Sequence, residues 1–91
     1  MTARQTIFQG RVQGVGFRYT CKDLAKGFDL TGSVENLPDG TVKLVLQGEL
    51  EEIEEYLDEL VQDSALSHHI KGHLTLPVEV DPDRLGFIIV R

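Results

Sequence analysis

The sequence predicts an α+β sandwich, in which two helices cover one face of a mainly antiparallel sheet. Along the chain, the two-residue hydrophobic spacing of strands gives way twice to the wider spacing of helices. A turn signal, Pro38-Asp39-Gly40, separates two alternating segments and indicates a hairpin. No linker, repeat or low-complexity tract interrupts the chain, so we expect a single domain over residues 1–91.

The first predicted elements are a strand and a helix. Residues 4–12 alternate, with Thr6 and Phe8 on one side and Ile7 on the other, as in a strand. The residues that follow place an apolar stripe on a helix: Phe17, Cys21, Leu24, Ala25 and Phe28. Gly27 stands near the expected end of this helix, where a residue in the left-handed conformation often stops a helix.

Two strands, a helix and two more strands are predicted next. Residues 31–37 and 41–48 form the hairpin strands, and the core face of the second comprises Val42, Leu44 and Leu46. The second helix begins with several glutamates, where the helix dipole favours negative charge, and its apolar residues are Leu50, Ile53, Leu57, Leu60 and Val61. In the strand after it we expect three residues to face inward: Ile70, Leu74 and Leu76.

A short final strand is expected over residues 86–91. The predicted order is therefore βαββαβ with a C-terminal strand appended, which is the order of a ferredoxin-like sandwich. That fold hosts many unrelated functions, so the function has to be argued from a site.

Composition narrows the function classes. Nine basic residues against fifteen acidic ones give a formal charge of −6, which disfavours nucleic acid as a partner. The single cysteine, Cys21, excludes an intramolecular disulfide and a Cys-rich zinc site. No apolar run approaches the ~20 residues of a membrane span, and no apolar signal segment opens the sequence. We therefore expect a cytoplasmic monomer with no membrane partner.

The segment between the first strand and the first helix is the candidate site. Residues 10–18 contain three glycines and two arginines, and glycines let successive backbone N–H groups turn toward one point. The helix N-terminus adds free N–H groups and a partial positive charge, and Arg18 adds a planar, permanently charged fork. The pattern is neither a Walker A loop nor a dinucleotide fingerprint. It indicates a binding site for a phosphoryl dianion, and the alternative is a glycine-containing turn between strand and helix with Arg18 pointing into water.

Residues 10–18, Gly-Arg-Val-Gln-Gly-Val-Gly-Phe-Arg, resemble the signature of the acylphosphatase family. A second segment at residues 32–42 resembles that family too, and the resemblance covers nearly the whole chain. It implies that Arg18 binds the substrate phosphate and that Asn36 positions the attacking water. It also implies that the loop holds the phosphate through the backbone amides of Gln13, Gly14, Val15, Gly16, Phe17 and Arg18.

The activity implied by this resemblance is hydrolysis of the carboxyl–phosphate bond of a small-molecule acyl phosphate, without a metal or an organic cofactor. The products would be a carboxylate and inorganic phosphate, and the phosphate would also act as an inhibitor. Family members often carry a bulky aromatic and a basic residue just before the asparagine, where this chain has Ser33 and Glu35. By strand alternation Glu35 should face away from Asn36.

Other interpretations remain open. The chain could be an anion-binding module that keeps the loop without turnover, or a domain of the kind that acts on carbamoyl phosphate in larger carbamoyl-transfer proteins. A generic ferredoxin-like interaction or nucleic-acid module is a third alternative, disfavoured by the acidic charge.

The three histidines invite a metal interpretation, but we expect none. If His68 and His69 are adjacent residues of a strand, their side chains diverge, and His73 would lie ~13 Å beyond His69. Cys21, within the apolar stripe, is expected to be a core residue rather than a nucleophile.

Overall fold

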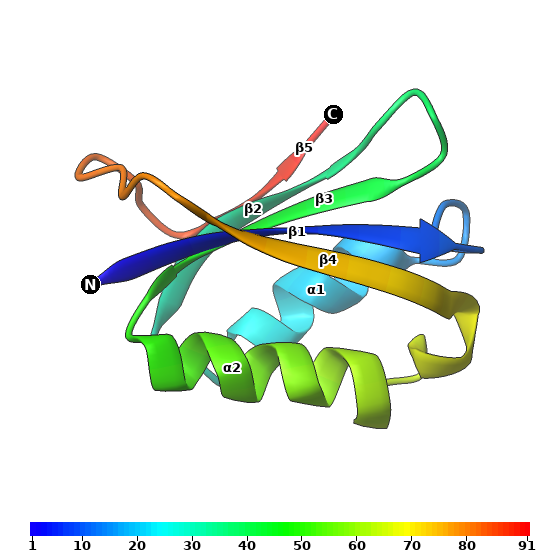
Figure 1. The fold of residues 1–91 in the computed structure, drawn as a ribbon, viewed down its shortest axis with the longest axis horizontal. Coiled ribbons are helices and arrows are strands. Elements are labelled where there is room, and N and C mark those ends of the chain that lie inside the picture. The colour runs from blue at the N-terminus through cyan, green and yellow to red at the C-terminus, as the bar shows by residue number, and fades with distance from the viewer.

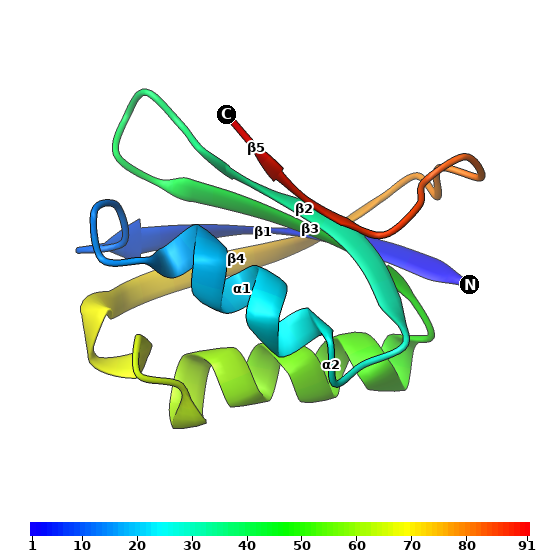
Figure 2. The same cartoon turned by 180° about the vertical axis from the view of Figure 1, so that it is seen from behind.

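The computed structural model describes all 91 residues and contains the expected order of elements. A five-stranded sheet carries both helices on one face, and its other face is open (Figures 1 and 2). The strand order is β4-β1-β3-β2-β5. The elements are β1 (Thr2–Gly10), α1 (Phe17–Ala25), β2 (Leu30–Asn36), β3 (Val42–Gly48), α2 (Leu50–Asp58), β4 (Ile70–Val78) and β5 (Phe87–Val90). The predicted ferredoxin-like α+β sandwich is confirmed.

The central strands pair antiparallel, and the edge strand β5 pairs in parallel with β2. In this parallel register Gly32 is opposite Phe87 and Glu35 is opposite Val90. The C-terminal end of β5 is therefore brought beside the end of β2, where Asn36 lies. Local sequence patterns carry no information on this pairing, since it joins segments more than fifty residues apart.

The hydrophobic core lies between the sheet and the helices. Its members include the predicted Phe17 and Cys21, the predicted core face of β3, and Phe8 of β1, and all of them are almost fully buried. Tyr56 is also fully buried, and its hydroxyl donates a 2.7 Å hydrogen bond to the backbone carbonyl of Cys21. This bond ties α2 to α1, the helix that begins at the candidate site.

The helix ends differ in detail from the expectation. Gly27 does not adopt a positive φ. The chain leaves α1 through backbone hydrogen bonds of the tighter i→i+3 kind, from Gly27 N–H to the Leu24 carbonyl and from Phe28 N–H to the Ala25 carbonyl. The α2 helix continues into a π-helical turn, Glu59–Asp63, in which Leu60 stays buried. None of the helices combines the length and the apolar character that crossing a membrane requires.

The expected inward face of β4 is wrong for two of its three residues. Leu74 and Leu76 are 61% and 49% exposed, because they lie on the open face of the sheet. Thr75 lies on the helix-bearing face instead, where its hydroxyl is 2.8 Å from the hydroxyl of its cross-strand partner Thr6. Only Ile70 packs against the core as expected.

A β-bulge explains this reversal. Gln9 pairs with Gly72, but the next residue of β1, Gly10, pairs with Ile70, so two residues of β4 face one of β1. The extra residue, Lys71, shifts the alternation and sends the later residues of β4 to the other face. Gly10 has a φ of 124°, and a Cβ atom there would overlap the backbone of β4.

The histidines do not sit as expected either. His68 and His69 belong to a 3₁₀ turn, Ser67–His69, that precedes β4, and their rings lie 4.2 Å apart rather than diverging. The ring of His73 lies 5.9 Å from the ring of Phe8. No group of three or more His, Cys, Asp or Glu side chains is arranged to hold a metal ion.

Candidate active site

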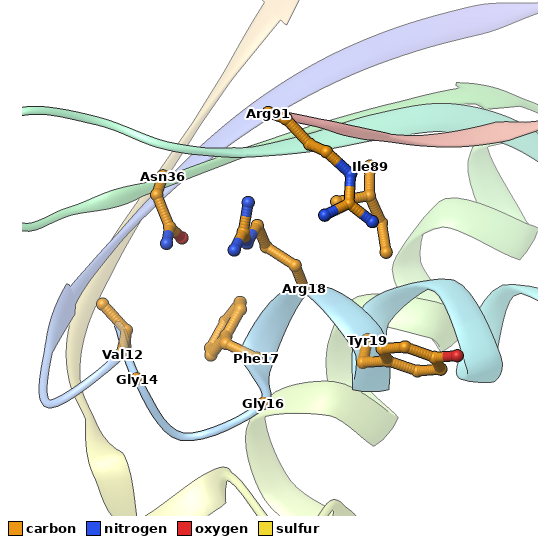
Figure 3. Close-up of a pocket in the computed structure, with 9 residues that line it drawn as sticks. All are labelled: Val12, Gly14, Gly16, Phe17, Arg18, Tyr19, Asn36, Ile89 and Arg91. Carbon is orange, nitrogen blue, oxygen red and sulfur yellow. The ribbon is translucent and has the colours of Figure 1, made fainter.

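A pocket of about 260 Å³ opens where the loop after β1, the start of α1 and the ends of β2 and β5 meet (Figure 3). It contains side chains from segments that are far apart in the sequence. The lining residues are Val12, Gly14, Gly16, Phe17, Arg18, Tyr19, Asn36, Ile89 and Arg91. Both arginine side chains reach into the space between these segments (Figure 3).

The loop between β1 and α1 leaves its backbone N–H groups free. Gly14 and Gly16 adopt left-handed φ angles of 78° and 79°, and Gly16 is the N-cap of α1. None of the N–H groups from Gln13 to Tyr19 donates a hydrogen bond within the protein. A run of free N–H groups in a loop with left-handed glycines, ahead of a helix N-terminus, is the arrangement that binds anions.

Arg18 brings a positive charge to this loop. It is the second residue of α1 and half-buried, and no carboxylate lies within salt-bridge distance of it. Its Nη1 donates a 3.3 Å hydrogen bond to the backbone carbonyl of Val90, at the end of β5. The guanidinium group of Arg18 is therefore held in place by a neutral carbonyl group, and its charge remains available to an anion in the pocket.

Asn36, the last residue of β2, supplies a polar acceptor beside the Arg18 guanidinium group, on the side away from Arg91 (Figure 3). Its Oδ1 is buried and receives no hydrogen bond from the protein. Buried polar atoms in proteins are almost always paired, so an unpaired one in a pocket marks a position where a ligand or water can donate. The preceding residue, Glu35, has its carboxylate 3.7 Å from the ammonium group of Lys43, on the adjacent strand β3.

Gln13 contributes its side chain to the frame of the site. Its Nε2 donates two hydrogen bonds, of 2.8 Å to the carbonyl of Leu37 and 2.9 Å to the carbonyl of Thr41. These carbonyls belong to the turn between β2 and β3, so Gln13 fastens the loop to the hairpin that carries Asn36. Neither Gln13 nor Val15 lines the pocket, and Val15 packs against the core instead.

The hairpin turn has its own local bonds. Thr41 donates to the Asp39 carboxylate through its hydroxyl, at 2.6 Å, and through its backbone N–H, at 3.0 Å. Both bonds lower the pKa of Asp39, and the bond from the hydroxyl has the larger effect. Gly40 adopts a φ of 92°, as the turn signal in the sequence predicts.

Behind the pocket lie two titratable groups that are kept neutral. Burial raises the pKa of the Cys21 thiol to about 12, and burial also raises the pKa of the Tyr56 hydroxyl. A nucleophilic cysteine needs a lowered pKa and exposure, so Cys21 is a core residue of the site's scaffold.

The sequence model of the acylphosphatase family matches residues 4–89. The chain belongs to the acylphosphatase family. Among similar curated proteins, an acylphosphatase from Lactobacillus gasseri is 36% identical over 75 residues, which are 82% of this chain and 81% of that protein. An acylphosphatase from Clostridium perfringens is 39% identical over 70 residues, or 77% and 79% of the two chains.

Solved structures of acylphosphatases share the fold. The crystal structure of the Bacillus subtilis acylphosphatase matches with a TM-score of 0.89 at 28% identity, covering all of both chains. Full-length HypF, solved with phosphate and nucleotide bound, matches with a TM-score of 0.87 at 33% identity. That match covers 99% of this chain and 12% of HypF.

Within this acylphosphatase-family site, five residues named from the sequence lie together: Gly14, Gly16, Phe17, Arg18 and Asn36. Sequence reasoning missed four lining residues, namely Val12, Tyr19, Ile89 and Arg91. Tyr19 carried a usable signal, because an aromatic residue beside Arg18 and outside the apolar stripe must be exposed. Ile89 and Arg91 carried none, since the parallel register of β5 brings them to the site.

Proposed function

We propose that this acylphosphatase-family protein hydrolyses acyl phosphates without a metal, that Arg18 and the loop amides bind the phosphate, and that Asn36 positions the attacking water. One observation carries the proposal: the unpaired Oδ1 of Asn36 lines the same pocket as the unneutralised guanidinium group of Arg18. A phosphate bound to Arg18 would lie beside an acceptor with no other partner. A site used only to bind anions gains nothing from such an acceptor.

Phosphate binding requires donors and positive charge. The free N–H groups from Gln13 to Tyr19 offer donors for the phosphoryl oxygens, and the N-terminus of α1 adds its partial positive charge. Arg18 offers the complementary planar fork. These groups would also stabilise the charge that the phosphoryl oxygens carry in the transition state, because they are held in place before the reaction.

The leaving group makes a general acid unnecessary. Attack of water on phosphorus forms a new P–O bond, and the bond between phosphorus and the acyl oxygen breaks with its electron pair on a carboxylate. The parent acid has a pKa of about 4, so this carboxylate leaves without protonation at neutral pH. This agrees with a pocket lined by no carboxylate or histidine side chain.

The attacking water needs orientation more than deprotonation. The Oδ1 of Asn36 can accept one of its hydrogen bonds, but a carboxamide is not a base near pH 7. We infer that one proton of the water passes to a phosphoryl oxygen of the substrate and that the other stays on the attacking oxygen. A dianionic acyl phosphate then gives a carboxylate and diprotonated phosphate, which exchanges its proton with solvent after release. Holding the water in line with the leaving oxygen lowers the entropic part of the activation barrier, because the reacting groups are already positioned.

The test is hydrolysis of benzoyl phosphate in the presence of EDTA, followed by ultraviolet absorbance. We expect the wild-type protein to turn over under chelation, and Arg18→Ala to lose at least 10²–10³-fold in kcat/KM, about 3–4 kcal/mol. Arg11→Ala is the matched control, because Arg11 is an exposed arginine of the same loop that does not line the pocket. It should keep near wild-type activity.

Inhibition by inorganic phosphate separates binding from catalysis. Arg18→Ala should weaken inhibition by phosphate, whereas Asn36→Ala should lower kcat and leave the inhibition constant nearly unchanged. If well-folded wild-type protein binds phosphate and hydrolyses no acyl phosphate, benzoyl and carbamoyl phosphate included, the anion-binding module is the correct interpretation. Equal losses for Arg11→Ala and Arg18→Ala would refute the assigned role of Arg18.

A further inference from the structure

The pocket continues into a groove between α1 and β5. A second cavity of about 200 Å³ is lined by Tyr19, Lys22, Asp23, Lys26, Ile89 and Arg91. Three of these residues, Tyr19, Ile89 and Arg91, also line the phosphate pocket, so the two spaces adjoin. We call this continuation the α1–β5 groove. The proposed roles of Arg18 and Asn36 leave it unused.

The groove is positively charged in an acidic protein. The only carboxylate side chain that lines it, Asp23, lies 3.4 Å from the ammonium group of Lys26, so these two charges offset each other. Neither Lys22 nor Arg91 forms an ion pair with an aspartate or glutamate side chain. Two unpaired cations therefore remain beside the phosphate pocket, although the whole chain carries a formal charge of −6.

The geometry of the proposed reaction directs the acyl group into this groove. In an in-line displacement the attacking water and the leaving oxygen lie on opposite sides of phosphorus. Asn36 and Arg91 lie on opposite sides of the Arg18 guanidinium group (Figure 3). With the water held at Asn36, the acyl group points toward Ile89, Arg91 and the groove.

The groove can recognise an acyl group that ends in an anion. Ile89 and the ring of Tyr19 offer apolar surface to a short carbon chain, and Arg91 offers a planar fork that matches a carboxylate. Lys22 follows Arg18 by four residues, so both lie on the same face of α1. A second anion on the acyl group would thus meet positive charge along the path that leads away from the phosphate.

On the basis of the proposed function, we propose that Arg91 and Lys22 form a second anion subsite, which selects acyl phosphates whose acyl group carries a carboxylate or other anionic group. Arg91 and Lys22 are specificity-determining residues in this assignment, and they take no part in the phosphoryl transfer. The substrate class is a short acyl phosphate with negative charge at both ends.

The test compares succinyl phosphate with butyryl phosphate, which has the same four-carbon chain and a methyl group in place of the carboxylate. We expect the wild-type protein to favour succinyl phosphate by about 2–5-fold in kcat/KM, as fits a charge pair near the surface. Arg91→Gln should bring this ratio close to one, and Lys22→Gln should lower it less. Raising the salt concentration to about 0.5 M should reduce the wild-type preference, because salt screens exposed charges.

Lys71→Gln is the matched control. Lys71 is an exposed cation on β4, at the opposite edge of the sheet, and its loss changes the net charge by the same amount. It should leave the ratio unchanged. A ratio that Arg91→Gln does not alter would overturn the subsite. So would an equal slowing of both substrates by Arg91→Gln, because Arg91 would then contact the transferred phosphate.

A binding measurement keeps this inference separate from the proposed function. Succinyl phosphonate and butyryl phosphonate have a P–C bond in place of the bond that is cleaved, and their affinities can be measured by titration calorimetry. Wild-type protein should bind succinyl phosphonate more tightly, and Arg91→Gln should remove the difference. Hydrolysis of neither phosphate would refute the proposed function alone; equal affinities for the two phosphonates would refute the subsite alone.

Discussion

Replacing Asn36 by leucine should make the protein more stable and nearly inactive. Leucine has the same number and branching of side-chain heavy atoms as asparagine, although it is larger, so Asn36→Leu replaces the oxygen and nitrogen of the carboxamide by two methyl groups. A buried acceptor without a partner destabilises a folded protein by about 1–3 kcal/mol. The Oδ1 of Asn36 is such an acceptor, but the whole side chain is only half-buried, which favours the lower part of that range.

We therefore expect the free energy of unfolding to rise by about 1 kcal/mol, and a domain of 60–100 residues then gains about 4–8 °C in Tm. Turnover of benzoyl phosphate should fall by about 10²–10³-fold, as is typical when one transition-state contact is lost. Urea unfolding and the absorbance assay on the same preparation measure both effects. Inhibition by inorganic phosphate should persist, since Arg18 and the loop amides are unchanged.

Thr31→Val provides the control. Thr31 lies near the other end of β2, its hydroxyl makes no hydrogen bond, and valine is again similar in shape. This variant corrects for any gain that comes from a more apolar β2, and it should leave turnover intact. A less stable Asn36→Leu protein would show that Asn36 supports the fold rather than the reaction, and full activity in that variant would refute the water-positioning role.

Three further predictions concern the frame around the site. Tyr56→Phe removes the donor to the Cys21 carbonyl and should lower the urea unfolding free energy by about 1 kcal/mol; an unchanged value would refute the link between the helices. Gly40→Ala is expected to lower the free energy of unfolding by about 1–3 kcal/mol, because Gly40 has a positive φ. Gly10→Ala should lower it far more, because Gly10 also has a positive φ and an added Cβ there would overlap the His69 carbonyl oxygen. Equal losses would contradict the bulge geometry. Because the pKa of Cys21 is raised to about 12, stability should decline as pH rises above about 8.5, where the thiol ionises in the unfolded chain but not in the folded one. The ionisation of Cys21 should lower the free energy of unfolding by up to about 1.4 kcal/mol per pH unit, and Cys21→Ala should lack this contribution. Urea unfolding of both proteins between pH 8 and 10 measures the difference.

Local patterns were sufficient for most of the fold. The spacing of apolar residues predicted the strands and helices, and the hairpin turn was predicted from Pro38-Asp39-Gly40, because each of these features depends on residues close in sequence. The faces of β4 could not be predicted in the same way. The bulge opposite Gly10 depends on the register of two strands about sixty residues apart, and one extra residue reverses every side chain beyond it.

In the candidate site, too, the residues that lie close together in the sequence could be predicted, and those brought together by strand pairing could not. Arg18 and the glycines belong to one continuous loop, so the sequence displays them together. Arg91 reaches the pocket only through the parallel pairing of β5 with β2, which no local pattern encodes. Only the backbone amide of Gln13 was expected to contribute to the site, and the role of its side chain was not predicted. Its partners are two carbonyls that become neighbours only after the hairpin has formed.

These two Gln13 hydrogen bonds have a consequence for how the sequence can drift over evolution. The glutamine recognises the main chain at Leu37 and Thr41, which every amino acid presents alike, so neither side chain is needed for the contact. The hairpin can therefore exchange residues at both positions while the loop and Asn36 stay in mutual alignment. The selective constraint falls on position 13 and on the length of the turn. An insertion there would separate the two carbonyls and disconnect the halves of the site, even with every pocket residue retained.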